Sequence, residues 1–255
     1  MKFLMAESLE LLQQFLWPLV RISAVFLTAP IFGANALNLR TRVAIGAVLT
    51  LLVFQTVTIP SIDPFSFPAL TIMLNEIVIG SLMGLVLQIV AAAIILSGQA
   101  VSAGMGLGMA NMIDPNLGNI PTLSNFFLVT GLLLFLSLGG HLVLISVLVD
   151  SFELLPIGGA FFSLSSVENF ISWTSNIFIG AVSLVLPVLV CLLMINVSLG
   201  VISRASPSLN IFAVGFPALI PIGIFLVMLT STFYFSQLEG IWYSSFDFLQ
   251  TLLRS

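Results

Sequence analysis

The chain has 255 residues, of which 6% are charged, whereas a soluble domain carries roughly 25% charged residues. Hydrophobic residues make up 59%, and the net charge is −4. So little charge cannot cover a water-facing surface, which excludes a soluble enzyme. So much apolar content also excludes a disordered chain. The composition therefore predicts a protein whose surroundings are mostly lipid or other apolar protein.

Chemistry-bearing residues are scarce. His141 and Cys191 are the single histidine and cysteine of the chain, so no zinc site of Cys and His can be built. A triad would need His141, which is better explained as a structural histidine, and Cys191 as a small packing residue. We expect no enzyme activity, no metal and no cofactor. Basic residues do not cluster, so we expect no nucleic-acid partner.

Charged residues divide the chain into long uncharged stretches, each able to supply the roughly 20 apolar residues that a spanning helix needs. The first stretch is not a cleaved signal peptide, because Glu7, Glu10 and Arg21 interrupt the required pattern. The sequence thus predicts an all-α, integral membrane-type protein. We expect about six long helices, at residues 9–28, 40–58, 69–102, 122–149, 169–202 and 209–235.

One predicted helix is too long for a bilayer. Leu70–Ser102 would extend about 50 Å against a hydrocarbon core of about 30 Å. Pro187, Pro217 and Pro221 interrupt two later helices. Overlong and kinked helices indicate packing against other protein more than solvation by lipid.

The most unusual segment, residues 97–118, combines glycines and methionines and ends in an Asp-Pro turn signal. Two interpretations stay open: a connection between helices with methionine as filler, which is the simpler one, and an apolar plug within a pore. A phosphate-binding loop is excluded, since no Lys or Arg lies between Arg42 and Arg204. The candidate plug residues are Gly104, Met105, Gly106, Leu107, Gly108, Met109, Met112, Asp114 and Pro115.

Glu76 and Arg21 are charged residues within the apolar runs of predicted helices. Glu76 has an interfacial and a functional interpretation, both open. Gly80 and Gly84, four residues apart, form a small-xxx-small pattern that predicts close packing of another helix. Arg21 either snorkels or pairs with an unidentified carboxylate.

Several short motifs occur along the chain in a distinctive order and spacing. They are Ala29-Pro30-Ile31-Phe32-Gly33 with Arg40 and Arg42, Glu76 with Ile79-Gly80 and Gly84, Met105-Gly106-Leu107 with Asp114-Pro115, Gly140-His141, Ser151-Phe152 with Pro156, Ser203-Arg204-Ala205 with Pro207, Leu209-Asn210 and Phe212, and Gly215-Phe216-Pro217. In this order and spacing the motifs resemble the FliR/SctT family of type III export-gate membrane proteins over essentially the full length. The chain departs from the family at Met109 and Met112, where aromatic residues are frequent, and at Ser208, where glutamine is frequent.

The resemblance implies a fold and an assembly. Residues 1–165 would form a FliP-like part, and residues 166–255 a FliQ-like helical hairpin and tail. The subunit would join FliP-like and FliQ-like subunits in a helical pore in the bacterial inner membrane at the flagellar basal body, with an FlhB-like switch protein and membrane lipid in contact. Unfolded flagellar proteins would pass through this pore.

The resemblance also assigns roles to residues. Residues 104–118 would match the plug loop inside the channel, and Glu76, Gly80 and Gly84 would pack between subunits. Arg204, Pro207 and Asn210 would lie at the cytoplasmic tip of the hairpin, in agreement with the preference of basic residues for that side.

Other functions remain alternatives at this point. A virulence injectisome would use an SctT-type subunit of the same architecture. A stand-alone transporter would need polar groups near the bilayer midplane or internal repeats, which are not evident in this sequence.

Overall fold

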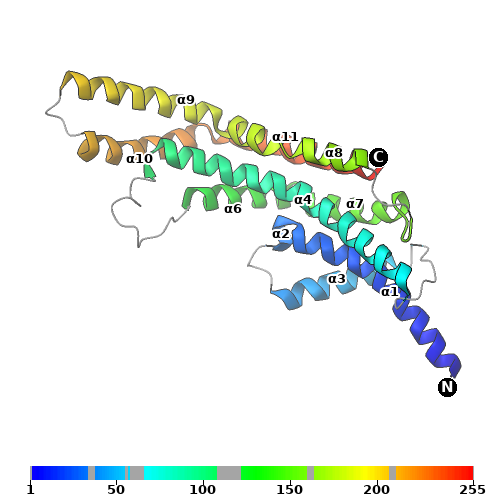
Figure 1. Ribbon diagram of the computed structural model, residues 1–255. Helices are drawn as coiled ribbons and strands as arrows, with labels where there is room; N and C mark the ends of the chain where they lie inside the picture. The colour runs from blue at the N-terminus through cyan, green and yellow to red at the C-terminus, as the bar shows by residue number, and fades with distance from the viewer. Residues whose placement is uncertain are drawn as a thin grey trace. The chain divides into compact units, whose positions relative to one another are not determined.

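The computed structural model describes residues 2–33, 38–54, 57, 66–107, 122–159, 164–206 and 211–254. Across these residues the chain forms helices, without strands, so the predicted all-α class is confirmed (Figure 1). The helices are α1 (Lys2–Thr28), α2 (Pro30–Gly33), α3 (Leu39–Val53), α4 (Phe67–Gly104), α6 (Thr122–Ser137), α7 (Gly140–Leu154), α8 (Leu164–Trp173), α9 (Asn176–Ala205), α10 (Ile211–Leu229) and α11 (Ser231–Arg254).

The overlong helix is present and exceeds the expected length. α4 has 38 residues, or about 57 Å at 1.5 Å per residue. Three expected helices are instead broken: the one at 122–149 divides at Gly139, the one at 169–202 divides after Trp173, and the one at 209–235 divides at Thr230. The C-terminal residues, which we expected to be a tail, form the 24-residue helix α11.

Backbone conformation explains the break at Gly139. This glycine has φ +73° and ψ +17°, the left-handed region that disfavours residues with a Cβ. Its carbonyl accepts bonds from the N–H groups of Leu142 and Val143, at 2.9 and 3.2 Å, and so starts α7. The apolar stretch at residues 122–149 carries no charged residue before its end, so we expected one continuous helix there.

The chain divides into two compact units. Unit 1 contains residues 1–89, 139–174 and 244–255, and unit 2 contains residues 90–138 and 175–243. The chain passes from one unit to the other at two helix breaks, before Gly139 and before Ser175. The expected division at residue 165 separates a FliP-like part from a FliQ-like hairpin. The two compact units do not test that likeness, so the division stays a prediction.

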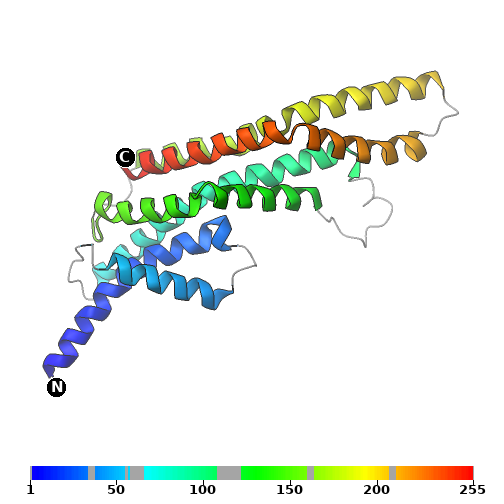
Figure 2. The ribbon, with the colours of Figure 1, turned by 180° about the vertical axis from the view of Figure 1, so that it is seen from behind.

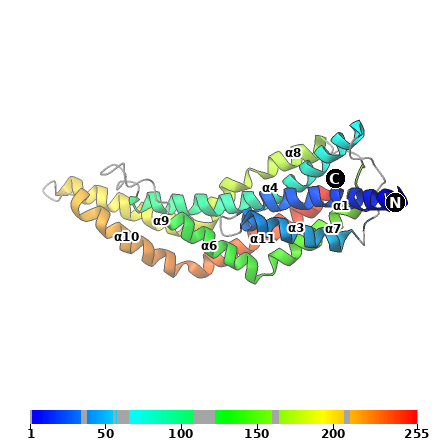
Figure 3. The same cartoon turned by 90° about the horizontal axis from the view of Figure 1, so that it is seen from below.

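In unit 1, α1 packs against α2 and α3 and also contacts the first half of α4 (Figure 3). Its helices come from distant parts of the sequence, since α7 and α8 belong to the same unit. The core side chains of this unit include Trp17, Ile22, Val25, Phe26, Ile79, Met83, Val86, Leu87, Leu144, Val147, Leu148 and Phe152.

Unit 2 combines the second half of α4 with α6, α9, α10 and most of α11. α9 and α10 lie side by side as a hairpin (Figure 2). α4 and α6 meet at Gly98, where a Cβ would lie 2.6 Å from the Cα of Ser124. The buried side chains include Ile94, Val101, Met105, Phe127, Phe135, Leu184, Val185, Val188, Leu192, Leu238 and Trp242.

Several segments are long and apolar enough to cross a membrane. Among the residues that the structure describes, two helical runs pass by length and composition, Phe67–Gly104 and Ser165–Ala205. The number rises to four if each of two bent helix pairs is one span. Several hydroxyl groups in these helices bond within their own helix, as Ser97 does to the carbonyl of Ile94 at 2.7 Å. This pattern suits apolar surroundings, where each polar group needs an internal partner.

The paired glycines of α4 face α1 of the same chain. A Cβ on Gly80 would lie 2.8 Å from the Cβ of Ala24 and would also collide with the carbonyl oxygen of Arg21. A Cβ on Gly84 would lie 2.8 Å from the backbone nitrogen of Ala29 and would overlap the Thr28 hydroxyl. The helix that approaches them closely in this structure is therefore α1, and their role between subunits stays a prediction.

We expect Gly84→Ala to destabilise unit 1, because the new methyl group meets backbone that cannot rotate away. Overpacking of this kind costs about 1–3 kcal/mol. Gly240→Ala is the matched control, since that helical glycine has open space around it and alanine favours a helix. The measurement is the midpoint of thermal unfolding of the detergent-solubilised chain. Equal midpoints for the two variants would contradict the close approach of α1 and α4.

Candidate functional site

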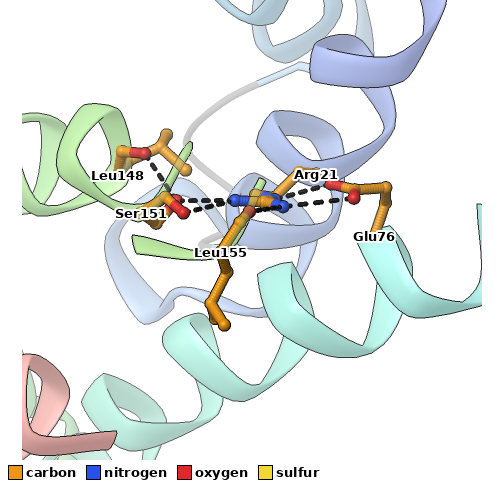
Figure 4. A network of polar contacts seen from close by, with 5 residues as sticks. All are labelled: Arg21, Glu76, Leu148, Ser151 and Leu155. Carbon is orange, nitrogen blue, oxygen red and sulfur yellow. Dashed lines mark hydrogen bonds and ion pairs between the residues drawn. The ribbon is translucent and has the colours of Figure 1, made fainter. Parts of the chain in front are cut away.

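A buried arginine joins three helices of unit 1. Arg21 lies on α1, and it meets Glu76 of α4 and the C-terminal end of α7 (Figure 4). Arg21 and Glu76 both have 0% exposure. The carboxylate that the sequence left unidentified is therefore Glu76, 55 residues away in the chain.

The Arg21–Glu76 contact is a bidentate ion pair. Nε of Arg21 donates to Oε2 of Glu76 at 2.6 Å, and Nη2 donates to Oε1 at 3.1 Å. Paired N–H donors on a planar guanidinium match the two oxygens of a carboxylate, which fixes the orientation of both groups. The pair therefore fixes the rotation of α1 relative to α4.

The remaining donors of Arg21 bind the end of α7. Nη1 donates to the carbonyl and the hydroxyl oxygen of Ser151, at 2.8 and 3.1 Å, and Nη2 donates to the carbonyl of Leu155 at 2.8 Å. A guanidinium has five N–H donors, and here each of the five has an acceptor. A cation at a helix C-terminus also satisfies carbonyls that lack a partner within the helix.

An aromatic ring completes the surroundings of Arg21. The guanidinium carbon lies 4.3 Å from the centroid of the Phe152 ring, a cation–π contact. The burial of two charges is costly, and it is offset only when geometry and hydrogen bonding are both nearly complete. The arrangement around Arg21 meets that condition, which makes it a junction of α1, α4 and α7.

The contacts of this cluster are those of a junction between helices. A group of three or more His, Cys, Asp or Glu side chains suitable for a metal ion is not found among the residues that the structure describes. Arg21 and Glu76 satisfy each other, and no second ionisable group contacts either of them in the described part of the chain. The site positions helices.

The start of the glycine–methionine segment is the part of the candidate plug that the structure describes. Gly104 ends α4, and Met105 is buried with 1% exposure. Gly106 has φ +74°, and its N–H donates to the carbonyl of Ala103 at 3.0 Å, so the chain leaves the helix at this glycine. Leu107 follows as a partly buried residue.

Two residues of the α9–α10 hairpin hold this helix end within unit 2. The side-chain amide of Asn196 donates to the carbonyl of Gly104 at 3.0 Å. Gly223 of α10 leaves the room that Met105 fills, since a Cβ there would lie 2.9 Å from the Met105 sulfur and nearer still to two of its carbons. Neither contact was predicted, because Asn196 and Gly223 lie about ninety positions or more from the end of α4 in the chain.

The other candidate residues are only partly described. Arg204 is exposed near the end of α9. His141 is partly buried next to the α7 start, and Cys191 is partly buried in α9. The remaining candidates lie outside the described residues: Gly108, Met109, Met112, Asp114, Pro115, Pro207 and Asn210.

We expect Arg21→Met to lower the free energy of unfolding by about 3–5 kcal/mol, because it leaves the Glu76 carboxylate buried without a counter-charge. The double variant Arg21→Met/Glu76→Leu should lose much less than the sum of the two single variants. Arg40→Met is the control, since Arg40 is exposed and such changes cost about 0.5 kcal/mol at most. SDS-induced unfolding of the purified chain measures all four proteins. Additive losses in the double variant would contradict the ion pair.

Comparison with known proteins identifies the family. Residues 12–245 match the family model described as bacterial export proteins, family 1. The chain is 35% identical to "Flagellar biosynthetic protein FliR" of Pectobacterium carotovorum subsp. carotovorum, over 97% of this chain and 95% of that protein. The Escherichia coli K12 protein of the same name is 35% identical, over 87% and 85%.

A third relative comes from a different secretion system. "Yop proteins translocation protein T" of Yersinia pestis is 30% identical, over 78% of each chain. The family match covers most of the chain, and three of the residues that carry the resemblance, Glu76, Ser151 and Phe152, surround Arg21. The chain therefore belongs to the bacterial export proteins of family 1, the FliR/SctT family.

Proposed function

We propose that this protein is a subunit of the flagellar type III export gate. It joins FliP-like and FliQ-like subunits and an FlhB-like switch protein in the bacterial inner membrane at the flagellar basal body. The resulting channel passes unfolded flagellar proteins, and this subunit performs no catalysis. The observation that carries the proposal is the 35% identity to FliR along nearly the whole of both chains.

Exposed apolar side chains support an assembled state. On α9 a row of them recurs every three or four residues, so they share one face of the helix. Such a large apolar surface on a folded chain marks contact with lipid or with another subunit. The row consists of Phe178, Val182, Leu186, Val190, Met194, Val197 and Val201.

The same proposal gives the glycine–methionine segment the role of a channel plug. An apolar constriction holds back ions by excluding water, without a charged filter. Methionine suits this role because it packs against varied surfaces. The contacts of Gly104 and Met105 with the hairpin attach the segment at its N-terminal end.

A virulence injectisome is the alternative assembly. The Yersinia relative matches with lower identity and over a smaller share of the chain than the FliR proteins of Pectobacterium and Escherichia coli. This difference favours the flagellar system.

We expect co-expression with FliP-like and FliQ-like subunits of the same organism to yield one stable complex, because the exposed apolar faces need partners. Native mass spectrometry of the detergent-purified material measures the composition. Gly84→Ala should lower the yield of complex, whereas Gly240→Ala should not. A monomer that takes up neither subunit would overturn the proposal.

For the plug, we expect a deletion of residues 106–112 to leave assembly largely intact and to make the membrane permeable to small solutes. A simple connector predicts misassembly or no effect. Solute uptake by cells that express the complex is measured beside the yield of complex, with the undeleted chain as control. An assembled deletion variant as tight as the undeleted complex would contradict the plug.

A further inference from the structure

Unit 2 contains a cavity of about 550 Å³ that the export-gate proposal does not use. Its walls come from α6, α9, α10 and α11, all within the one unit. This volume lies within the range of ligand-binding pockets, about 300–1,000 Å³. The lining residues are Thr122, Leu123, Phe126, Phe127, Thr130, Leu184, Val185, Val188, Ile224, Val227, Met228, Thr230, Ser231, Tyr234 and Phe235.

Each wall is one face of a helix. α10 contributes Ile224, Val227 and Met228, which have the i, i+3, i+4 spacing of neighbours on a helix surface. α6 and α11 contribute residues at the same spacing, beginning at Leu123 and Ser231. Convergence of such faces from several helices makes a hollow bounded by side chains.

The walls suit a hydrocarbon and little else. None of the lining residues carries a charge. The Thr130 hydroxyl bonds to the carbonyls of Phe126 and Phe127 at 2.9 and 3.0 Å, and the Thr230 hydroxyl bonds to the carbonyl of Leu226 at 2.9 Å. These two hydroxyls bond to backbone carbonyls, and the Tyr234 hydroxyl donates to the carbonyl of Phe127 at 3.5 Å. Val, Leu, Ile, Met and Phe side chains supply most of the remaining wall. An apolar cavity of this kind takes up apolar guests in preference to water.

The cavity lies where an apolar helix gives way to a more polar one. α10 carries no charged side chain, whereas α11 begins with Ser231 and continues through polar positions to Glu239. Phe126 and Met228 line the cavity and are 55% and 70% exposed, so apolar surface continues outward from it. An amphiphile fits this gradient, with its chain against α10 and its polar end toward α11.

We propose that this cavity binds one acyl chain of a membrane phospholipid. α9, which forms one wall, belongs to a run long and apolar enough to cross a membrane, and phospholipid acyl chains are the apolar molecules that a membrane supplies. The uncharged walls and the engaged hydroxyls match an alkyl chain. The bound lipid would be a structural component of unit 2 that fills space between α6 and the helices opposite.

Photo-cross-linking tests the occupant directly. The full chain is purified with its co-expressed subunits, with p-benzoylphenylalanine in place of Phe126, and is exposed to vesicles of palmitoyl-oleoyl phosphatidylglycerol. It is then washed in detergent before irradiation. The control position is Phe178, which is 68% exposed on α9 and does not line the cavity. We expect a phospholipid adduct at position 126 in at least fivefold excess over position 178, measured by intact mass.

A matched pair of substitutions then separates the cavity from the general lipid surface. Val227→Phe fills the cavity and should lower the adduct at position 126 at least fivefold per assembled complex. Val197→Phe is the same change on an exposed part of α9 outside the cavity and should leave the adduct unchanged. An adduct to another protein subunit would show a side chain as the occupant and overturn the proposal. The absence of any adduct, or an adduct insensitive to Val227→Phe, would overturn it too.

Discussion

The packing of unit 1 depends on the hydrogen-bonding capacity of one guanidinium. Arg21 is fully buried, so each of its five N–H donors needs an acceptor within the protein. Glu76 supplies two acceptors, and Ser151 and Leu155 supply three. Three helices must therefore arrive at the same point, and a displacement of any one leaves a buried donor or a buried charge without its partner.

The glycines of α4 and the arginine of α1 act on the same contact. Gly80 lies one turn after Glu76 and faces the Arg21 backbone, so the absence of a Cβ permits the short distance that the ion pair requires. Direction and distance thus have separate origins: the ion pair sets the orientation of the two helices, and the glycines permit their approach. Either feature alone would leave the packing of α1 on α4 less defined.

Much of the helical content could be predicted from the sequence, because long apolar stretches have few alternatives to helix in apolar surroundings. The break at Gly139 could not, since a glycine in an apolar run is equally compatible with a continuous helix. The helix at the C-terminus was not predicted because α11 mixes polar and apolar residues. Helices were expected only in long stretches without charged residues, and such a mixed helix does not form one.

In the candidate site, the individual residues could be predicted from the sequence but their contacts could not. Arg21 and Glu76 stood out individually, since charged residues are rare in apolar helices. Their pairing did not, because no local spacing relates positions 55 residues apart. Arg21 also binds backbone groups that a sequence pattern does not reveal. The carbonyls of Ser151 and Leu155 are available as acceptors only because α7 ends there.

At the end of α4 in unit 2, carbonyls at a helix C-terminus again find partners outside the helix, but these partners bind more weakly than a guanidinium. Its last turn leaves carbonyls without an intrahelical partner, and the Asn196 amide satisfies the one on Gly104. Met105 fills the space that Gly223 leaves open, which ties the helix end to both helices of the hairpin. A neutral amide and a flexible thioether hold less firmly than a saturated guanidinium. The two helix junctions therefore differ in strength in a way that suits a rigid unit 1 and an adjustable attachment at residue 105.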